Sequence, residues 1–471
     1  MTTMDITGRG RAFRMRPLAA CLAAACAVSL SLAEPGFAAP SAPAHDRARP
    51  FVSAMVSAPP LRPAAVVTNC DDSGPGSLRD AAGAAASGDL IDLSGLSCSH
   101  ITLTTGAIVM GQHDIGFHGP GRNSLAVDAS GSPGNSAFFH IGGGTLAIDG
   151  ITIENGSKYR NDANARGGCV YSNGNIVLEH ATVDHCSAST RNPYFSFGGG
   201  VYSGGSTYLL DTRVTNNRSL ATNSYANAGG VFSYGNLQTN YAQISDNSAV
   251  GFNSWGGGVF TRGASLIMNT EISGNTANNR AGAAFANTSG AAQTMINSTV
   301  SGNVAGHVVG GVDSSTALFM YNCTVAFNSA QVWNDGAGTY FGAGVNIAVA
   351  STIYSSILSN NTVPGVGTPG DIFDLSGNAP GIAGGDDVIM EFNIGLPASV
   401  DHGDPGLGPL QDNGGPTHTH RPTSVNTNYG DNILNLSTDQ RGAGFPRVTV
   451  AGVTVGAYER NPDVIFINGF N

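Results

Sequence analysis

One phrase of about 25–33 residues recurs seven times between Val170 and Asn360, and it limits the possible folds more than any single residue does. Each copy has a glycine-rich step, a β-branched residue and, 16 residues later, an asparagine. The clearest copies are Val201–Asn217, Val231–Asn247, Val259–Asn275 and Val312–Asn328. In the first copy, which starts at Val170, Cys186 takes the asparagine position. The fifth copy (Gly282 to Asn303) is irregular, and the last copy, from Val345 to Asn360, is one residue shorter. Such a repeat predicts a solenoid in which each unit packs only on its neighbours.

Alignment of the copies on the asparagine position gives three columns of like residues. Three places before it stand β-branched residues, namely Val183, Val214, Ile244, Ile272, Val300, Val325 and Ile357. Two places earlier stand small residues, namely Ala181, Thr212, Ala242, Thr270, Ser298, Cys323 and Ser355. Between these columns stand polar residues, namely Thr182, Arg213, Gln243, Glu271, Thr299, Thr324 and Ser356. This alternation with period two predicts a strand that has one inward and one outward face.

Copies of one strand that stack on each other would lie about 4.8 Å apart, so that like side chains form ladders. Asparagine suits a ladder, because it tolerates a left-handed turn and its amide can bond the asparagine of the next coil. Charged residues make up only 11% of the chain, as expected where like charges would repel from coil to coil. We therefore predict an all-β fold, a single-stranded right-handed parallel β-helix. Ser77–Ala86, with Ser77 as N-cap, predicts a helix that caps the first coil.

The chain is expected to divide into five parts. Residues 1–39 have arginines before an apolar run and small residues at the end, which is typical of a secretory signal peptide. Residues 40–64 predict a linker rich in proline and alanine, residues 65–400 the β-helix, residues 401–460 a segment that closes it, and residues 461–471 a tail. No other stretch reaches 18 apolar residues, so no membrane span is expected. The net charge of −11 argues against a nucleic-acid partner, and we expect an exported monomer, secreted or at the cell surface.

Five cysteines follow the predicted signal peptide. Cys70 and Cys98 lie near the start of the predicted β-helix, and Cys169 and Cys186 lie within one repeat copy. Both pairs suit disulfide bonds in an oxidising compartment, although the sequence leaves their connectivity open. Cys323 stands in the small inward column, where a buried and unreactive thiol is expected.

Both ends of the predicted β-helix carry specific motifs. Val67–Arg79 has the sequence VTNCDDSGPGSLR, and Asp404–His420 has the sequence DPGLGPLQDNGGPTHTH. Shorter motifs follow at Thr438–Gly442, Phe445–Arg447 and Gly456–Glu459. Together they resemble the opening and closing signatures of the choice-of-anchor Q domain family of bacterial surface proteins, and the repeats are similar to those of polymorphic outer-membrane proteins. The resemblance covers about residues 65–460 and implies a secreted, pectate-lyase-like β-helix without a settled activity.

A polysaccharide-degrading β-helix, either a lyase or a glycoside hydrolase, would need carboxylates on neighbouring coils of one outward column. Neither the column that starts at Thr182 nor the one that starts at Asp184 carries two acids on adjacent coils from there onward. Two further groups are weak candidates for a metal site. A solvated loop explains the first group, Asp371, Asp374, Asp386 and Asp387, and packing of the closing segment explains the second, His418 with His420. The enzyme therefore stands as the alternative function, with no catalytic residue, metal or cofactor assigned.

The arc from the asparagine to the next glycine-rich step varies in length, from 9 residues after Asn303 to 17 after Asn328. These variable loops must all emerge on one side of the solenoid. They carry the rings of Tyr194, Phe195, Tyr225, Phe252, Trp255, Trp333 and Tyr340. Aromatic faces beside amide and guanidinium donors are suited to an extracellular polysaccharide or surface glycan, although the rings could instead pack into the loops. We expect a binding or structural, adhesin-like role.

Overall fold

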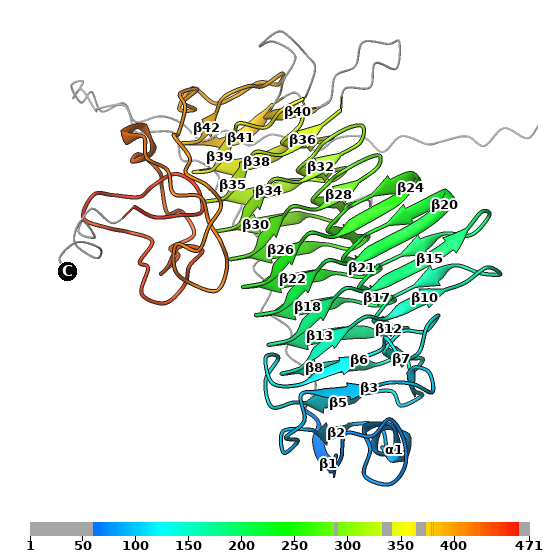
Figure 1. The fold of residues 1–471 in the computed structure, drawn as a ribbon. Helices are drawn as coiled ribbons and strands as arrows, with labels where there is room; N and C mark the ends of the chain where they lie inside the picture. The colour runs from blue at the N-terminus through cyan, green and yellow to red at the C-terminus, as the bar shows by residue number, and fades with distance from the viewer. Residues whose placement is uncertain are drawn as a thin grey trace, which may run out of the picture. The chain divides into compact units, whose positions relative to one another are not determined.

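The computed structural model describes residues 60–286, 291–331, 342–363, 374–377, 379 and 381–460. The predicted signal peptide, residues 40–59 of the predicted linker, the tail, and the candidate rings of Trp333 and Tyr340 lie outside these residues. The described chain is an all-β solenoid of parallel strands that starts with one α-helix (Figure 1). The predicted fold class, a parallel β-helix with an N-terminal capping helix, is confirmed.

The strands form four parallel sheets, which we call A, B, C and D. A full coil gives one strand to each sheet, in the order C, A, B, D along the chain. Sheet A contains β1 (Arg62–Val66), β2 (Asp89–Asp92), β5 (Ile115–His118), β8 (Thr145–Asp149), β13 (Asn175–Glu179), β18 (Thr207–Leu210), β22 (Leu237–Asn240), β26 (Ser265–Met268), β30 (Gln293–Ile296), β34 (Leu318–Tyr321), β38 (Ser351–Tyr354) and β41 (Ile382–Gly385). Sheet B contains β3 (His100–Thr102), β6 (Ala126–Asp128), β9 (Thr152–Glu154), β14 (Thr182–Asp184), β19 (Arg213–Thr215), β23 (Gln243–Ser245), β27 (Glu271–Ser273), β31 (Thr299–Ser301), β35 (Thr324–Ala326), β39 (Ile357–Ser359) and β42 (Val388–Ile389).

Sheet C contains β4 (Ile108–Met110), β7 (Phe138–His140), β12 (Val170–Ser172), β17 (Val201–Ser203), β21 (Val231–Ser233), β25 (Val259–Thr261), β29 (Ala284–Ala286), β33 (Val312–Ser314), β37 (Val345–Ile347) and β40 (Leu375–Gly377). Sheet D contains β10 (Ser157–Tyr159), β11 (Ala165–Arg166), β15 (Ser187–Arg191), β16 (Ser196–Phe197), β20 (Arg218–Asn227), β24 (Ser248–Trp255), β28 (Thr276–Ala277), β32 (Val304–Ala305) and β36 (Ser329–Ala330). The inward side chains of sheets A, B and C form one continuous apolar core; Val183, Val214 and Ile244, for example, are fully buried in it.

The predicted asparagine ladder runs along the corner between sheets B and D. Its members are Asn217, Asn247, Asn275, Asn303, Asn328 and Asn361, all of them buried. From Asn217 to Asn328, each side-chain amide donates to Oδ1 of the next asparagine at 2.8–2.9 Å, and each backbone N–H donates to the same oxygen; Asn361 donates to Asp374 in the same way. Every ladder amide therefore has partners on the coil ahead, which is what a buried polar group requires.

The last repeat copy was predicted one residue out of register. Asn361, not Asn360, accepts the bonds of Asn328, so this copy also spans 16 residues from Val345. Asn360 instead takes the left-handed turn before the ladder, with φ of 58°. Leu358 rather than Ile357 then pairs with Val325 in the inward column. Because Asn360 and Asn361 are adjacent, the sequence allowed either one as the ladder residue. The correct register places Leu358 in the column that is otherwise β-branched, so the sequence pattern favoured the wrong register.

The N-terminal end of the solenoid is covered by α1 (Leu78–Ala84) and by β1. Ser77 is the N-cap of α1, since its side chain accepts a hydrogen bond from the backbone of Asp80 at 3.2 Å. Residues 62–64 were assigned to the linker, but they belong to β1, which pairs with β2 at the edge of sheet A. An unpaired strand edge is unfavourable, and Pro63 is tolerated because β1 is the edge strand.

The cysteines form the two disulfide bonds that their positions suggested. Cys70 bonds Cys98 beside the first coil, and Cys169 bonds Cys186 within one coil. Cys323 is a free and fully buried thiol, as expected for the small inward column.

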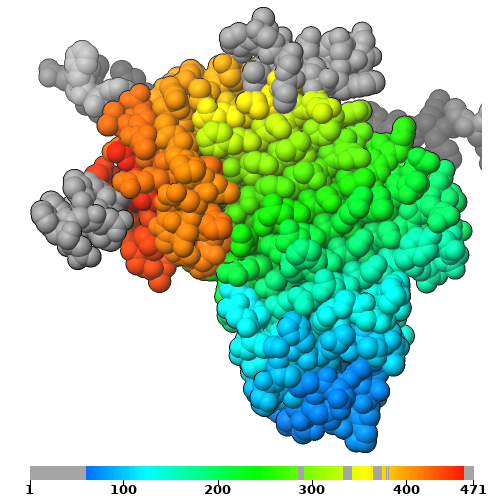
Figure 2. Space-filling model, viewed as in Figure 1, coloured from blue at the N-terminus to red at the C-terminus, as the bar shows by residue number. Residues whose placement is uncertain are grey.

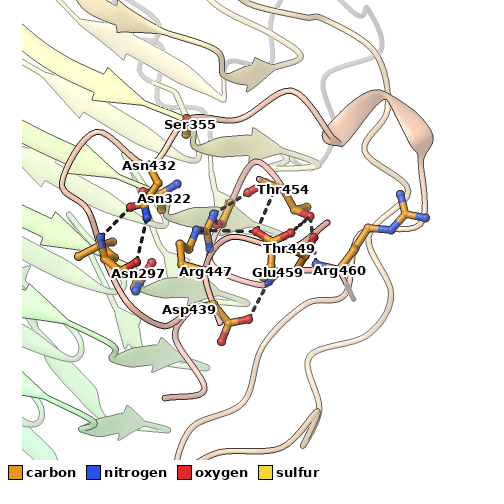
Figure 3. A network of polar contacts seen from close by, with 12 residues as sticks. Asn297, Asn322, Ser355, Asn432, Asp439, Arg447, Thr449, Thr454, Glu459 and Arg460 are labelled. Carbon is orange, nitrogen blue, oxygen red and sulfur yellow. Dashed lines mark hydrogen bonds and ion pairs between the residues drawn. The ribbon is translucent and has the colours of Figure 1, made fainter. Parts of the chain in front are cut away.

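The closing segment, residues 401–460, lies along the outward faces of sheets A and B beside β26–β39 (Figures 1 and 2). It contains one 3-10 turn, η2 (Val425–Thr427). Asn297 and Asn322 donate to its backbone carbonyls at Thr438 and Asp431, and Ser355 accepts from the Asp431 N–H at 2.6 Å (Figure 3). Apolar side chains of the segment pack on the outward residues of sheet A, namely Ile433, Leu434 and Leu436 on Leu266, Ile296 and Tyr321.

Candidate functional site

Sheet D forms a wing on the early coils, which we define as β15, β16, β20 and β24. The variable arcs were predicted to be loops, but here they are strands, of ten residues in β20 and eight in β24. Farther along, β28, β32 and β36 contain only two residues each. The wing strands extend to one side of the coils (Figure 1). The arcs thus emerge on one side, as expected, and their extra length is stabilised by pairing between neighbouring coils.

Beneath the wing lies a ladder of stacked rings that the sequence analysis missed. It occupies the outward face of sheet C and consists of Phe139, Tyr171, Tyr202, Phe232 and Phe260, one on each coil. Successive ring centroids lie 4.5–5.4 Å apart. A usable signal was present, because an aromatic residue directly follows the β-branched residue in consecutive repeat copies.

Side chains of the wing, together with Arg166 on the neighbouring β11, cover this ladder. Phe197 packs on Phe232 at 5.0 Å between centroids, and Trp255 stacks on Phe260 at 6.3 Å. The guanidinium of Arg166 lies 5.2 Å from the ring of Tyr202. Stacked and edge-to-face rings stabilise each other beyond simple burial, so the ladder fixes the wing rigidly on the coils.

Three of the predicted ligand-binding rings form a row on the wing, on the face that also carries Phe197. Phe195 and Tyr225 meet edge to face with centroids 5.2 Å apart, and Tyr225 meets Trp255 edge to face at 6.4 Å. Phe195 and Tyr225 are 36% and 40% exposed, while Trp255 is half-buried. The row therefore combines two partly exposed rings with a half-buried one, and its members lie just before β16, on β20 and on β24.

The other predicted rings are not part of this row. Phe252 lies on β24 and is 81% exposed, and Tyr194 is half-buried in the turn between β15 and β16. Neither makes a ring–ring contact with another described residue. Trp333 and Tyr340 lie outside the described residues.

Sheet B carries a second candidate, a column of carboxylates. Asp128, Glu154 and Asp184 occupy one outward column on three consecutive coils. His185 Nδ1 lies 2.6 Å from Asp184 Oδ2, and His100 Nε2 lies 3.7 Å from Glu154 Oε1. The inference that no outward column holds two neighbouring acids is therefore wrong. It started at Thr182 and Asp184, where the repeat becomes regular, and the two preceding coils supply the other acids.

The environment moves the pKa values of these carboxyls in opposite directions. Burial and the nearby Asp128 carboxylate raise the pKa of Glu154. Burial also acts on Asp184, but hydrogen bonds from Asn216, Thr215 and His185 outweigh it and lower the pKa of that carboxyl. Hydrogen bonds from Ser130 and Asn155 likewise outweigh burial and lower the pKa of Asp128. A carboxyl with a raised pKa between two carboxyls with lowered pKa values is a pattern found in general acid–base sites.

The closing segment covers the later part of the same face. Glu271 is buried and accepts from the backbone of His418 at 3.0 Å, and its carboxylate lies 3.1 Å from His418 Nδ1. The ring of His420 bonds Ser301 at 2.7 Å. Only the coils before β27 keep an open carboxylate column, and His418 and His420 belong to packing of the closing segment.

Asp374 and Asp387 lie in the last coil, where they continue two ladders instead of forming a solvated loop. Asp374 accepts from the backbone and side chain of Asn361, and Asp387 accepts from the Ser356 N–H at 2.8 Å. Both carboxyls are buried. In the described part of the chain, no three histidine, cysteine or acidic side chains form a group suited to a metal ion.

Comparison with protein-family models, with curated proteins and with solved structures finds no match for this chain. Among the described residues, no helix has the length and apolar character needed to cross a membrane.

Proposed function

We propose that this protein is a secreted or cell-surface β-helix with an adhesin-like role, which binds an extracellular glycan through the ring row on its wing. The observation that carries the proposal is the row of Phe195, Tyr225 and Trp255, in which two rings stay partly exposed although all three contact other rings. Large, rigid aromatic side chains give contact area at a small entropy cost, which suits a binding surface. A row that follows successive coils also suits a ligand made of repeated units.

Export is proposed on separate grounds. The sequence of residues 1–39 is typical of a secretory signal peptide, and the two disulfides fit an oxidising compartment. The motifs at both ends of the β-helix, which resemble those of the choice-of-anchor Q domain family, support a place at the cell surface.

The test is a glycan array probed with the wild-type protein, followed by affinity measurements on single variants. Tyr225→Ala and Phe195→Ala should each weaken a wing ligand by about fivefold, because each removes one ring of the row. Tyr234→Ala is the matched control, since Tyr234 is 52% exposed and lies outside the wing. Unchanged affinity in both wing variants, or no glycan bound by the wild type, would contradict the proposal.

A second candidate function, hydrolysis of a polysaccharide, is favoured by the carboxylate column. Neighbouring coils lie about 4.8 Å apart, close to the ~5 Å between the two carboxyls of retaining glycosidases. In this scheme Glu154 holds the proton for the leaving group, and Asp128 or Asp184 is the ionised partner. Glu154→Gln should abolish release of reducing ends from a panel of uronic-acid and neutral glycans, whereas Glu179→Gln on sheet A should not. Silence of the wild type across that panel would remove this candidate.

A further inference from the structure

A hollow on the outward face of sheet A is used by neither candidate function. One outward column of this sheet runs through Leu90, Gly116, Ala147, Val177 and Tyr208 on successive coils. The side chain of Leu61 occupies the space over Gly116, and the small residue Ala147 leaves a depression next to it. The depression forms a cavity of about 220 Å³ beside Leu61.

The floor of this hollow is apolar and one rim is acidic. Ala147, Val177 and Leu61 belong to one apolar cluster that faces away from the core. The rim is the next outward column, with His118, Asp149 and Glu179 on successive coils. Both oxygens of Asp149 are occupied, by His118 at 2.7 Å and by His180 at 2.9 Å.

Glu179 is the unpaired acid of the rim. Among the described residues, its carboxylate has no hydrogen bond and no ion pair, although it lines the cavity. Burial and the neighbouring Asp149 raise the pKa of Glu179, and the opposing effect of His180 compensates them only in part. A cation placed at this rim would complete that compensation.

We propose that the hollow binds a lysine side chain of a partner peptide, with the aliphatic stem on Ala147, Val177 and Leu61 and the ammonium group at Glu179. A lysine side chain matches both parts of the site, because its four-carbon stem can lie on the apolar floor while its charged end contacts the acid on the rim. An anionic group is disfavoured beside two carboxylates. A neutral aliphatic side chain would leave Glu179 without a partner.

The experiment uses the full chain and a short peptide, acetyl-Gly-Lys-Gly-amide, with its Nε-acetyl-lysine form as the neutral control. Binding is followed by NMR through the methyl groups of Ala147 and Val177. The lysine peptide should shift these methyls and bind at least about fivefold more tightly than its acetylated form, the gain expected of a part-exposed ion pair. This test is independent of glycan binding and of hydrolysis.

Two variants separate the charge from the shape of the site. Glu179→Gln should weaken the peptide by about fivefold through loss of the charge. Ala147→Leu should weaken it by filling the hollow, and the fold tolerates leucine in this column, as at Leu90 and Leu266. Glu154→Gln on sheet B should change nothing, and each variant is checked for an unchanged melting temperature. Equal binding of the acetylated peptide, or an unaltered affinity of Glu179→Gln, would overturn the proposal.

Discussion

The side-chain amide of Asn361 donates to Oδ1 of Asp374 at 2.7 Å, so the asparagine ladder ends on a buried carboxylate. Asp374 also accepts from the backbone N–H groups of Asn361 and Glu391. An acid can accept on both oxygens, and at this last position no further coil has to receive a donated bond. An aspartate, whose charge would be repelled by like charges on neighbouring coils inside a ladder, therefore fits at the end of this ladder.

This ladder end predicts that the protein loses stability as the pH rises through the acidic range. Burial raises the pKa of Asp374 to about 7 from 3.8, although hydrogen bonds from Asn361 and Glu391 oppose the change. The folded state holds the proton longer than the unfolded state, so the contribution is complete below about pH 4 and is lost as the pH rises to about 7. Asp374→Asn should flatten the dependence of the melting temperature on pH in this range.

The exposed Asp162→Asn is the matched control for that measurement and should leave the profile unchanged. Burial also raises the pKa of Asp387 well above its usual value, so both variants should keep the loss of stability that this second carboxyl contributes as the pH rises. A wild-type melting temperature that rises from pH 4 to pH 7 would contradict the prediction.

Asn275→Ala should destabilise the protein by several kcal/mol. The amide of Asn275 donates to Ile244 O and to Asn303 Oδ1, and its oxygen accepts two bonds from Asn247. Truncation leaves these buried partners unsatisfied, at about 1–3 kcal/mol each before relaxation. Chemical denaturation should show a lower midpoint, and Asn161→Ala, at an exposed position, is the control. A loss below about 1 kcal/mol would mean that the ladder adds little to stability.

The sequence predicted the parts of the fold that repeat. The inward column, the asparagine ladder and the buried Cys323 followed from period-two alternation, because each residue meets its own equivalent on the next coil. The register failed only at Asn360, where two asparagines stand side by side and Leu358 replaces the β-branched residue.

The candidate sites were harder to predict, because they depend on residues outside the repeat. Asp128 and Glu154 lie on early coils without the repeat phrase, so that only strand pairing aligns them with Asp184. The position of the closing segment depends on contacts between residues far apart in the sequence, such as Glu271 with His418. The sequence drew attention to Phe195, Tyr225 and Trp255, but their edge-to-face arrangement follows from packing on the ring ladder of sheet C.

Cys323 should not react with thiol reagents in the folded protein. Burial raises the pKa of this thiol to about 12, so almost no thiolate is present at neutral pH, and the side chain is also inaccessible. In protein that lacks residues 1–39, and with them Cys21 and Cys26, iodoacetamide under non-reducing conditions should modify no cysteine in buffer and one per chain in denaturant. Fast labelling of the native protein would show that the inward column opens.

The contact between Glu271 and His418 should tie the closing segment to sheet B in a manner that depends on pH. The hydrogen bond and charge of Glu271 raise the pKa of His418, which is therefore protonated over a wider range than in the unfolded chain. Its contribution is present below pH 6.5, the usual pKa of histidine, and is lost as the pH rises through the folded-state value. Hydrogen exchange of residues 412–420 should accelerate as the pH passes this value, beyond the intrinsic change.

His418→Gln is expected to abolish that additional acceleration. His402→Gln is the control, because the ring of His402 bonds the Ile389 carbonyl, away from Glu271. Equal pH dependence in the wild type and in His418→Gln would show that the histidine charge does not hold the segment.

Arg447 and Glu459 should show strong coupling in the core of the closing segment. Arg447 is fully buried and donates to the carbonyls of Thr454 and Gly456, while its Nε lies 3.9 Å from Glu459 Oε2 (Figure 3). Removal of one buried charge leaves the other uncompensated, so Arg447→Met alone is expected to cost about 3–5 kcal/mol. The double variant with Glu459→Gln should lose less than the sum of the two single changes, by at least about 1 kcal/mol. Unfolding free energies of the four proteins measure this coupling, and strictly additive losses would mean that the two charges do not compensate each other.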